Sequence, residues 1–338
     1  SAMLIVASPR FEEHVTPPGH PERPERAHVF DTVAAAWARK GGNVHAPRPA
    51  TKDELVLVHD PGYVEEIDAL AGKPAMLDAD TFMSPESRDV AVLAAGAAVQ
   101  AAEHALEGNE PAFALVRPPG HHAERNRAMG FCLFNSIAVA AAAMRRRGLE
   151  RIAIVDIDVH HGNGTQAMFY SDSRVLYVST HQYPFYPGTG AATETGHGEG
   201  LGFTVNVPME AGSNDADFLR VHEAIIAPVL EQYKPQLTLV SAGYDAHERD
   251  PLASMRMTTA GYTAVVASLR DLAARHGALA LVTEGGYELR ALTECLSASI
   301  AVLDGGSPPV IGGAPSPASR ADRAISAATS ALREFWQL

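Results

Sequence analysis

One segment near the middle of the chain passes from an apolar run directly into a polar cluster. Residues 152–155 are Ile-Ala-Ile-Val, and residues 156–164 hold two aspartates, two histidines, two glycines and an asparagine. An apolar run of this kind predicts a strand that is buried on both faces, with the polar cluster at its carboxyl end. Asp158 and His160 are two residues apart, so an extended chain can point both to one side. An oxygen donor and a nitrogen donor together form half of a zinc-type site.

Other short apolar runs predict the remaining strands of the same sheet. They lie at Leu4–Ala7, Ala112–Val116, Val175–Thr180, Leu237–Ser241 and Leu279–Thr283. Helical patterns lie between the strands, at Pro85–Leu106, Asn135–Arg147, Asp215–Gln232 and Thr259–Arg275. This alternation predicts an α/β domain with a central, mostly parallel sheet and helices on both faces.

The ends of the chain and its loops complete the predicted organisation. We expect a single domain over residues 3–338, with Ser1-Ala2 as a tag remnant before Met3. Gly188–Gly202 is glycine-rich and has no strong period, which predicts a long loop. Residues 304–318 are rich in Gly, Pro and Ser, which predicts a surface loop before a last helix at about Arg320 to Phe335.

Composition narrows the class of protein. A net charge of −13 argues against a nucleic-acid-binding surface. Cys132 and Cys295 are the two cysteines, too few for a disulfide framework or a four-cysteine zinc site, and this favours a reducing, cytoplasmic location. No apolar run is long enough to span a membrane. The sequence leaves the oligomeric state open.

Four of the predicted strands are followed by unusual polar residues. These segments are Arg117–His122, Asp156–Gly164, Ala242–Asp245 and Glu284–Tyr287. Ligands of open parallel sheets bind beyond the carboxyl ends of the strands. Adjacent strands would therefore bring the four segments together. This convergence carries more weight than any single motif.

The first part of the converging set is a candidate metal centre. Asp158, His160 and Asp245 can supply three ligands, and a catalytic zinc keeps a further position open for water or substrate. Bound zinc lowers the pKa of its water to about 7 and polarises a carbonyl group.

The second part can move protons beside that metal. The tandem histidines His121 and His122 offer a proton acceptor and a donor. Asp156 can hold one imidazole and Asn163 the other. Tyr287, which follows two glycines, can donate its hydroxyl to a developing oxyanion. Each residue alone has an ordinary structural explanation, but together they suit metal-assisted hydrolysis of an amide.

These residues lie in motifs that resemble the zinc-dependent histone deacetylase family, in its class II and bacterial deacetylase-like amidohydrolase branch. The chain also resembles the acetylpolyamine amidohydrolases of that superfamily. The resemblance begins at residue 19 and runs past Tyr287. The motifs are Arg117–Glu124, Met129–Asn135, Asp156–Gln166, Tyr186–Gly190 and Ser241–Asp245. The resemblance implies the arginase–deacetylase fold.

The resemblance also implies roles for the candidate residues. It implies one catalytic zinc on the three ligands named above. His122 would be the main general base and acid, and His121, paired with Asp156, an electrostatic partner. Asn163 matches class II members, where class I members carry a carboxylate. Tyr287 would polarise the acetyl carbonyl, and it separates this chain from the weakly active class IIa branch, which has histidine there.

Further residues match the substrate tunnel of the family. Phe131 and Tyr186 match the aromatic walls around the alkyl stem of the substrate, with the Gly130 backbone beside them. Asp80 aligns loosely with a carboxylate at the rim that holds the substrate backbone. Arg26 matches an arginine that lines the acetate exit channel.

The resemblance finally implies one or two structural potassium ions. The residues matching the first site are Asp156, Asp158, His160, Ser179 and Thr180. The residues matching an outer, second site are Phe169, Asp172, Val175 and Phe203.

The resulting functional prediction is a zinc-dependent amidohydrolase that removes acetyl or other acyl groups from lysine side chains or related acylamines. Its partners would be an acylated lysine peptide or an acetylpolyamine, with no nucleic acid and no membrane. Acetylpolyamine hydrolysis as the main activity is the first alternative. A manganese ureohydrolase and a non-catalytic binder of acylamines are the others.

Overall fold

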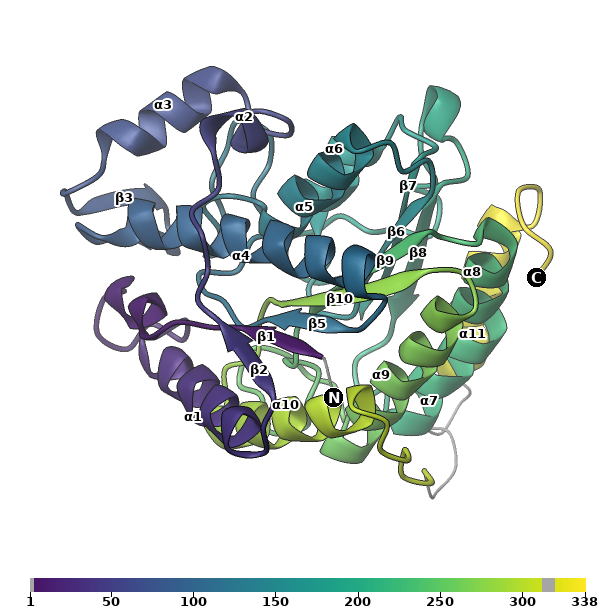
Figure 1. Cartoon of the computed structure of the whole chain (residues 1–338). Helices are drawn as coiled ribbons and strands as arrows, with labels where there is room; N and C mark the ends of the chain where they lie inside the picture. The colour runs from purple at the N-terminus through teal and green to yellow at the C-terminus, as the bar shows by residue number, and fades with distance from the viewer. Residues whose placement is uncertain (1–2, 312–319) are drawn as a thin grey trace.

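The computed structural model describes residues 3–311 and 320–338, which build one large sheet between two layers of helices (Figure 1). Eight strands form this sheet in the order β2-β1-β5-β10-β9-β6-β7-β8, and each neighbouring pair is parallel. Their bounds are β1 Leu4–Val6, β2 Asn43–His45, β5 Ala112–Ala114, β6 Ile152–Asp156, β7 Val175–Gln182, β8 Thr204–Met209, β9 Leu237–Ala242 and β10 Ala278–Thr283. The predicted α/β architecture and the six predicted strands are confirmed.

The two edge strands, β2 and β8, are not among the predicted strands. β8 contains Pro208, which has no N–H for a neighbouring strand and suits an edge position. β2 spans three residues, and its side chains are exposed or half-buried. Neither strand carries the continuous apolar run that marks a central strand.

Side chains of the central strands alternate between two separate hydrophobic cores. On β6, Ile152 and Ile154 pack into one core, while Ala153 and Val155 pack into the other. The first core lies under α2 to α6 and the second under α1 and α7 to α11. The pattern explains why strands that are apolar on both faces indicate a sheet covered on both sides.

The helices of the first layer are α2 Lys52–Leu55, α3 Pro61–Ala69, α4 Ser87–Gly108, α5 Ser136–Arg146 and α6 Asn163–Phe169. The second layer holds α1 Glu25–Arg39, α7 Asp215–Val221, α8 Ala227–Tyr233, α9 Thr259–Ala274, α10 Leu289–Leu303 and α11 Arg320–Leu332. A hairpin of β3 (Ala75–Asp78) and β4 (Thr81–Met83) lies beside the first layer. No helix in the described ranges is both long and apolar enough to cross a membrane.

Local sequence explains how α5 begins and ends. The Asn135 side chain accepts a hydrogen bond from the Ala138 N–H at 3.2 Å and so caps the first turn. Arg145 and Arg146 lie in the last turn, where cations favour the negative end of the helix dipole.

Two predicted helices differ from the structure. The helix predicted over Asp215–Gln232 contains a π-helical turn at His222–Ile226, where the Ala227 N–H bonds to the His222 carbonyl. Pro228 lacks an N–H and cannot continue the regular pattern, so the helix takes up one extra residue there. The last helix ends at Leu332 rather than Phe335. The predicted tag remnant at residues 1–2 and residues 312–318 of the predicted loop lie outside the described residues.

His222 in the π-helical turn makes stability depend on pH. The side chain is buried, and among the described residues neither ring nitrogen has a hydrogen-bond partner. Burial lowers its pKa from 6.5 to about 4. Between these values the unfolded chain binds more protons, so the free energy of unfolding falls as pH falls. His222 accounts for about 3 kcal/mol of that loss, at about 1.4 kcal/mol per pKa unit.

The matching experiment is urea unfolding of the wild type and of His222→Leu between pH 7 and pH 4. The variant should lose less stability over this range, because it has no imidazole to protonate. The other buried histidines remain in both proteins and cancel in the comparison. An identical pH dependence of the two proteins would contradict the assignment.

Candidate active site

The four strands that carry the polar segments are consecutive neighbours in the sheet, in the order β5-β10-β9-β6. Asp156 on β6 pairs with Ser241 on β9, and Ala242 on β9 pairs with Thr283 on β10. The carboxyl ends of these strands are therefore level. The structure confirms the predicted convergence of the segments that follow them.

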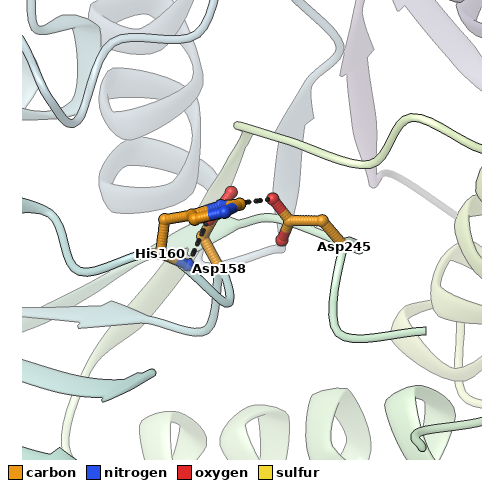
Figure 2. Close-up of side chains that lie close together, drawn as sticks. All are labelled: Asp158, His160 and Asp245. Atoms are coloured by element: carbon orange, nitrogen blue, oxygen red, sulfur yellow. Dashed lines mark hydrogen bonds and ion pairs between the residues drawn. The ribbon is translucent and has the colours of Figure 1, made fainter. Parts of the chain in front are cut away.

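Three buried side chains, Asp158, His160 and Asp245, meet at this edge (Figure 2). One potential ligand atom from each lies within 4.8 Å of the others. The His160 Nδ1 atom is 3.2 Å from Asp245 Oδ2 and 3.5 Å from Asp158 Oδ1. His160 Nε2 lies 3.2 Å from the Leu252 carbonyl, an acceptor only, so Nε2 donates there. A metal bound between the carboxylates would take the place of the proton on Nδ1.

The charges of this group favour a bound cation. Burial opposes protonation of His160, yet hydrogen bonds and charge from the two aspartates raise its pKa to about 10. Burial and the Asp158 charge raise the pKa of Asp245. A positive charge between the carboxylates of Asp158 and Asp245 is therefore favourable. Two carboxylates and an imidazole form a donor set that suits zinc, so the residues fit the predicted metal.

The tandem histidines are held by different partners. His121 Nδ1 lies 2.8 Å from Asp156 Oδ2, and His122 Nδ1 lies 2.8 Å from Asn163 Oδ1. The Asn163 amide donates to Glu124 at 2.9 Å, which turns its oxygen toward His122. His122 therefore donates through Nδ1 and keeps Nε2 as a proton acceptor.

The imidazoles of His121 and His122 also differ in pKa. Burial opposes protonation of His121, but Asp156 and Asp158 outweigh it and raise its pKa well above the usual value. Burial and the positive charge of His121 lower the pKa of His122 well below the usual value. These pKa shifts favour a neutral His122 beside a cationic His121. Two groups with pKa values driven apart are typical of acid–base sites.

A cavity of about 250 Å³ leads to these residues. Its lining residues are Asp80, His122, Gly130, Phe131, His160, Phe185, Tyr186, Leu252 and Tyr287. The structure thus brings all four predicted tunnel residues to one cavity. Tyr186 is 44% exposed and Asp80 is exposed, which places both at the mouth.

Gly130 allows the backbone beside Phe131 to approach the His122 ring closely. Its φ is +56°, and a Cβ atom would lie 2.5 Å from Cδ2 of the His122 ring. A side chain there would displace the imidazole.

Gly130→Ala is therefore expected to lower kcat about 10²-fold, the cost of displacing a reacting group by about 1 Å. Steady-state kinetics would check this, and Gly62→Ala is the control, because a Cβ there meets open space; wild-type kcat in Gly130→Ala would contradict the expectation.

Tyr287 is placed by the loop that follows β10. Its N–H donates to Asp250 at 2.8 Å, and its ring lies edge-on to Phe131 and 5.0 Å from the Arg26 guanidinium carbon. Burial raises the pKa of the Tyr287 hydroxyl well above 10, so it stays a donor. Gly285 just before it lies so close to the aspartates that a Cβ would be 2.4 Å from Asp245 Oδ2.

Arg26 is fully buried and holds the same loop. It donates to the carbonyls of Glu284 and Gly286 at 2.7 Å each. These bonds hold the Arg26 guanidinium next to the Tyr287 ring. Its predicted role in an acetate channel stays a prediction.

The residues of the first predicted potassium set lie on β6, on β7 and in the segment after β6, and neither potassium set is tested. Asp156 and Ser179 are paired across β6 and β7, and the Asp158 N–H donates to the Asp156 carboxylate at 3.2 Å. In the outer set, the Asp172 N–H donates to the Phe169 carbonyl, and the Tyr177 N–H donates to the Phe203 carbonyl. A carbonyl with one such bond retains a free lone pair. Both potassium sites remain predictions.

Several residues at the site are not among those predicted from the sequence. Phe185 stacks on His160 with ring centroids 5.3 Å apart. Leu252 lines the cavity, and Asp250 accepts the N–H groups of Leu252 and Tyr287. Phe185 could have been found because it precedes Tyr186 in a recognised motif. Asp250 and Leu252 lie in a loop after Asp245, where no local pattern marks them.

Comparisons with known proteins agree with this geometry. The histone deacetylase domain model matches residues 20–303. A probable deacetylase of Archaeoglobus fulgidus is 40% identical over 84% of this chain and 81% of its own length. A histone deacetylase-like amidohydrolase of Pseudomonas aeruginosa is 40% identical over 86% of this chain and 79% of its own length.

A solved structure shows the same fold. The crystal structure of the HDA15 HD domain superposes with a TM-score of 0.93 at 36% identity, over 99% of this chain and 95% of that one. Fold, site geometry and sequence all point the same way: the chain belongs to the histone deacetylase family.

Proposed function

We propose that this protein is a zinc-dependent hydrolase of acylated amines, with the acylated lysine side chain of a polypeptide as its main substrate. One observation carries the proposal: the imidazole of His122, the candidate metal ligand His160 and the residue Tyr287 line one cavity. Zinc held by Asp158, His160 and Asp245 would polarise the acyl carbonyl and acidify a water molecule.

The residues of the chain have complementary tasks in this reaction. His122 Nε2 takes a proton from the attacking water, whose oxygen forms a bond to the carbonyl carbon. The Tyr287 hydroxyl donates a hydrogen bond to the resulting oxyanion. The C–N bond then breaks, and the imidazolium of His122 returns the proton to the departing amine. Carboxylate and free amine are the products.

The cavity wall favours a substrate with an alkyl stem. Phe131 and Tyr186 supply aromatic surface along it, and Asp80 lies at its mouth. The net charge of −13 suits cationic substrates of either candidate class, lysine-rich peptides or polyamines. Acetylpolyamine hydrolysis therefore stays the alternative.

The ureohydrolase alternative requires a second metal ion. Within residues 3–311 and 320–338, the three ligands above are the one cluster of histidine, cysteine and acidic side chains close enough to hold a metal. His161, which follows the ligand His160, is bound by Thr189 and Gln166 instead. The site thus supports one metal rather than two.

A kinetic panel tests the proposal. Acetyl-lysine peptides, longer acyl-lysine peptides and acetylated polyamines would be compared by kcat/KM in the zinc-loaded protein. We expect the highest value for an acyl-lysine peptide. A higher value for an acetylpolyamine would favour the alternative, and binding without turnover of any acylamine would favour the non-catalytic binder.

A further inference from the structure

Glu284 is a buried carboxylate beside the site that does not line the cavity. It follows the last residue of β10 and is 1% exposed. Burial raises its pKa to about 7, against the opposing effect of the His121 charge. A buried carboxylate costs free energy unless its oxygens are well bonded, so its partners indicate what it does.

Both carboxylate oxygens of Glu284 are bonded to other segments of the site. Oε1 accepts the N–H groups of Gly120 and His121, at 2.8 and 3.1 Å. Oε2 accepts the Ser241 hydroxyl at 2.8 Å. The Glu284 N–H in turn donates to the Ala242 carbonyl at 3.0 Å.

These bonds join three loops that carry the candidate catalytic groups. Gly120 and His121 directly precede the base His122. Ser241 is the last residue but one of β9, four residues before Asp245, and Glu284 itself lies three residues before Tyr287. One side chain thus connects the loop of the base, the loop of a metal ligand and the loop of the oxyanion donor.

We propose that Glu284 is a positioning residue, which holds the Gly120–His121 backbone so that His122 faces the substrate carbonyl. The inference rests on the proposed function, because it assigns His122 the role of base. The backbone there has little other freedom, since a Cβ on Gly120 would lie 2.7 Å from the Phe134 carbonyl. Both N–H groups have the carboxylate as their acceptor, and a buried N–H group without an acceptor is unfavourable, so the backbone is expected to move if the carboxylate is removed.

Two variants separate hydrogen bonding from other effects. Glu284→Gln keeps an oxygen for both N–H groups and a donor for the Ser241 hydroxyl, so we expect kcat within about threefold of wild type. Glu284→Ala removes all three bonds, and we expect kcat to fall about 10²-fold with KM and zinc affinity within about threefold, because a reacting group displaced by about 1 Å costs that much. A purely structural role would lower the stability of Glu284→Ala and leave the kcat of the folded protein unchanged.

A milder variant keeps the test decisive if Glu284→Ala does not fold. Ser241→Ala removes one of the three bonds, and we expect kcat to fall about three- to tenfold while the protein stays folded. Glu54→Gln is the matched control, a buried carboxylate that caps α2 and pairs with Arg48. It should lower stability and leave kcat unchanged.

A crystal structure of Glu284→Ala, or of Ser241→Ala if the former is unstable, gives a readout that does not depend on turnover. We expect the Gly120–His122 backbone to shift relative to Asp158, whichever acylamine proves to be the substrate. An unshifted backbone would overturn the inference, and so would wild-type kcat in both Glu284→Ala and Ser241→Ala. Loss of activity in Glu284→Gln equal to that in Glu284→Ala would also overturn it, because charge rather than hydrogen bonding would then be decisive. Absence of turnover in the wild type would instead count against the proposed function alone.

Discussion

Asp245→Asn should bind zinc poorly and lose at least about 10³-fold in kcat/KM. The amide keeps the size of the carboxylate and can still accept the Val159 N–H, so the fold should survive. The amide lacks the negative charge with which Asp245 would attract zinc to the site. Changes to residues that only support a metal ligand cost about 10–100-fold, so loss of a direct ligand should cost more.

The measurement for Asp245→Asn is metal content after dialysis, together with turnover at a fixed substrate concentration. We expect well under one zinc per chain, against about one in the wild type. Excess zinc should restore little activity. A variant that retained full zinc content and turnover would remove Asp245 from the metal site.

Tyr287→Phe should lower kcat by about 10²–10³-fold, equal to about 2.7–4 kcal/mol, as for loss of another oxyanion-stabilising donor. The phenyl ring keeps the packing against Phe131 and Arg26. KM should stay within about threefold, because the hydroxyl acts on charge that develops during the reaction.

Steady-state kinetics of Tyr287→Phe would be paired with Tyr233→Phe as a control. Tyr233 is also buried and donates to the Ser173 carbonyl at 2.9 Å, but it lies at the end of α8. Its variant should lose some stability and keep full kcat. Near-normal kcat in Tyr287→Phe would exclude the oxyanion role.

The sequence was most informative where the local pattern and chain order agree. Apolar runs identified the central strands, and polar segments after four of them predicted the ligand cluster around Asp158. The prediction holds because the carboxyl ends of parallel strands lie at the same edge of the sheet, and this does not depend on the loops that connect the strands. Adjacency of β5, β10, β9 and β6 is what makes the residues converge.

Other elements have patterns that could have been found. In α10, Leu292, Cys295, Leu296, Ser299 and Leu303 are buried at helical spacing. The same spacing marks α1. α1 directly follows Pro24, and α10 begins three residues after Gly286, so each helix starts next to a residue that usually marks a turn. Pro228 likewise signals the irregular turn in the helix before it.

The supporting residues of the site have no local pattern at all. Glu284 is bonded to Gly120, which lies 164 residues away in the chain, and Asp250 is bonded to Tyr287, 37 residues away. Their burial and partners depend on how several loops pack together. Only the three-dimensional structure brings them to the site.

Metal add-back to the chelated protein tests the central claim most directly. Turnover of an acetyl-lysine peptide would be followed as zinc is titrated into protein stripped with a chelator. The account predicts no turnover at the start and a rise that saturates at one zinc per chain. Turnover that survives chelation, or that requires two manganese ions per chain, would contradict it.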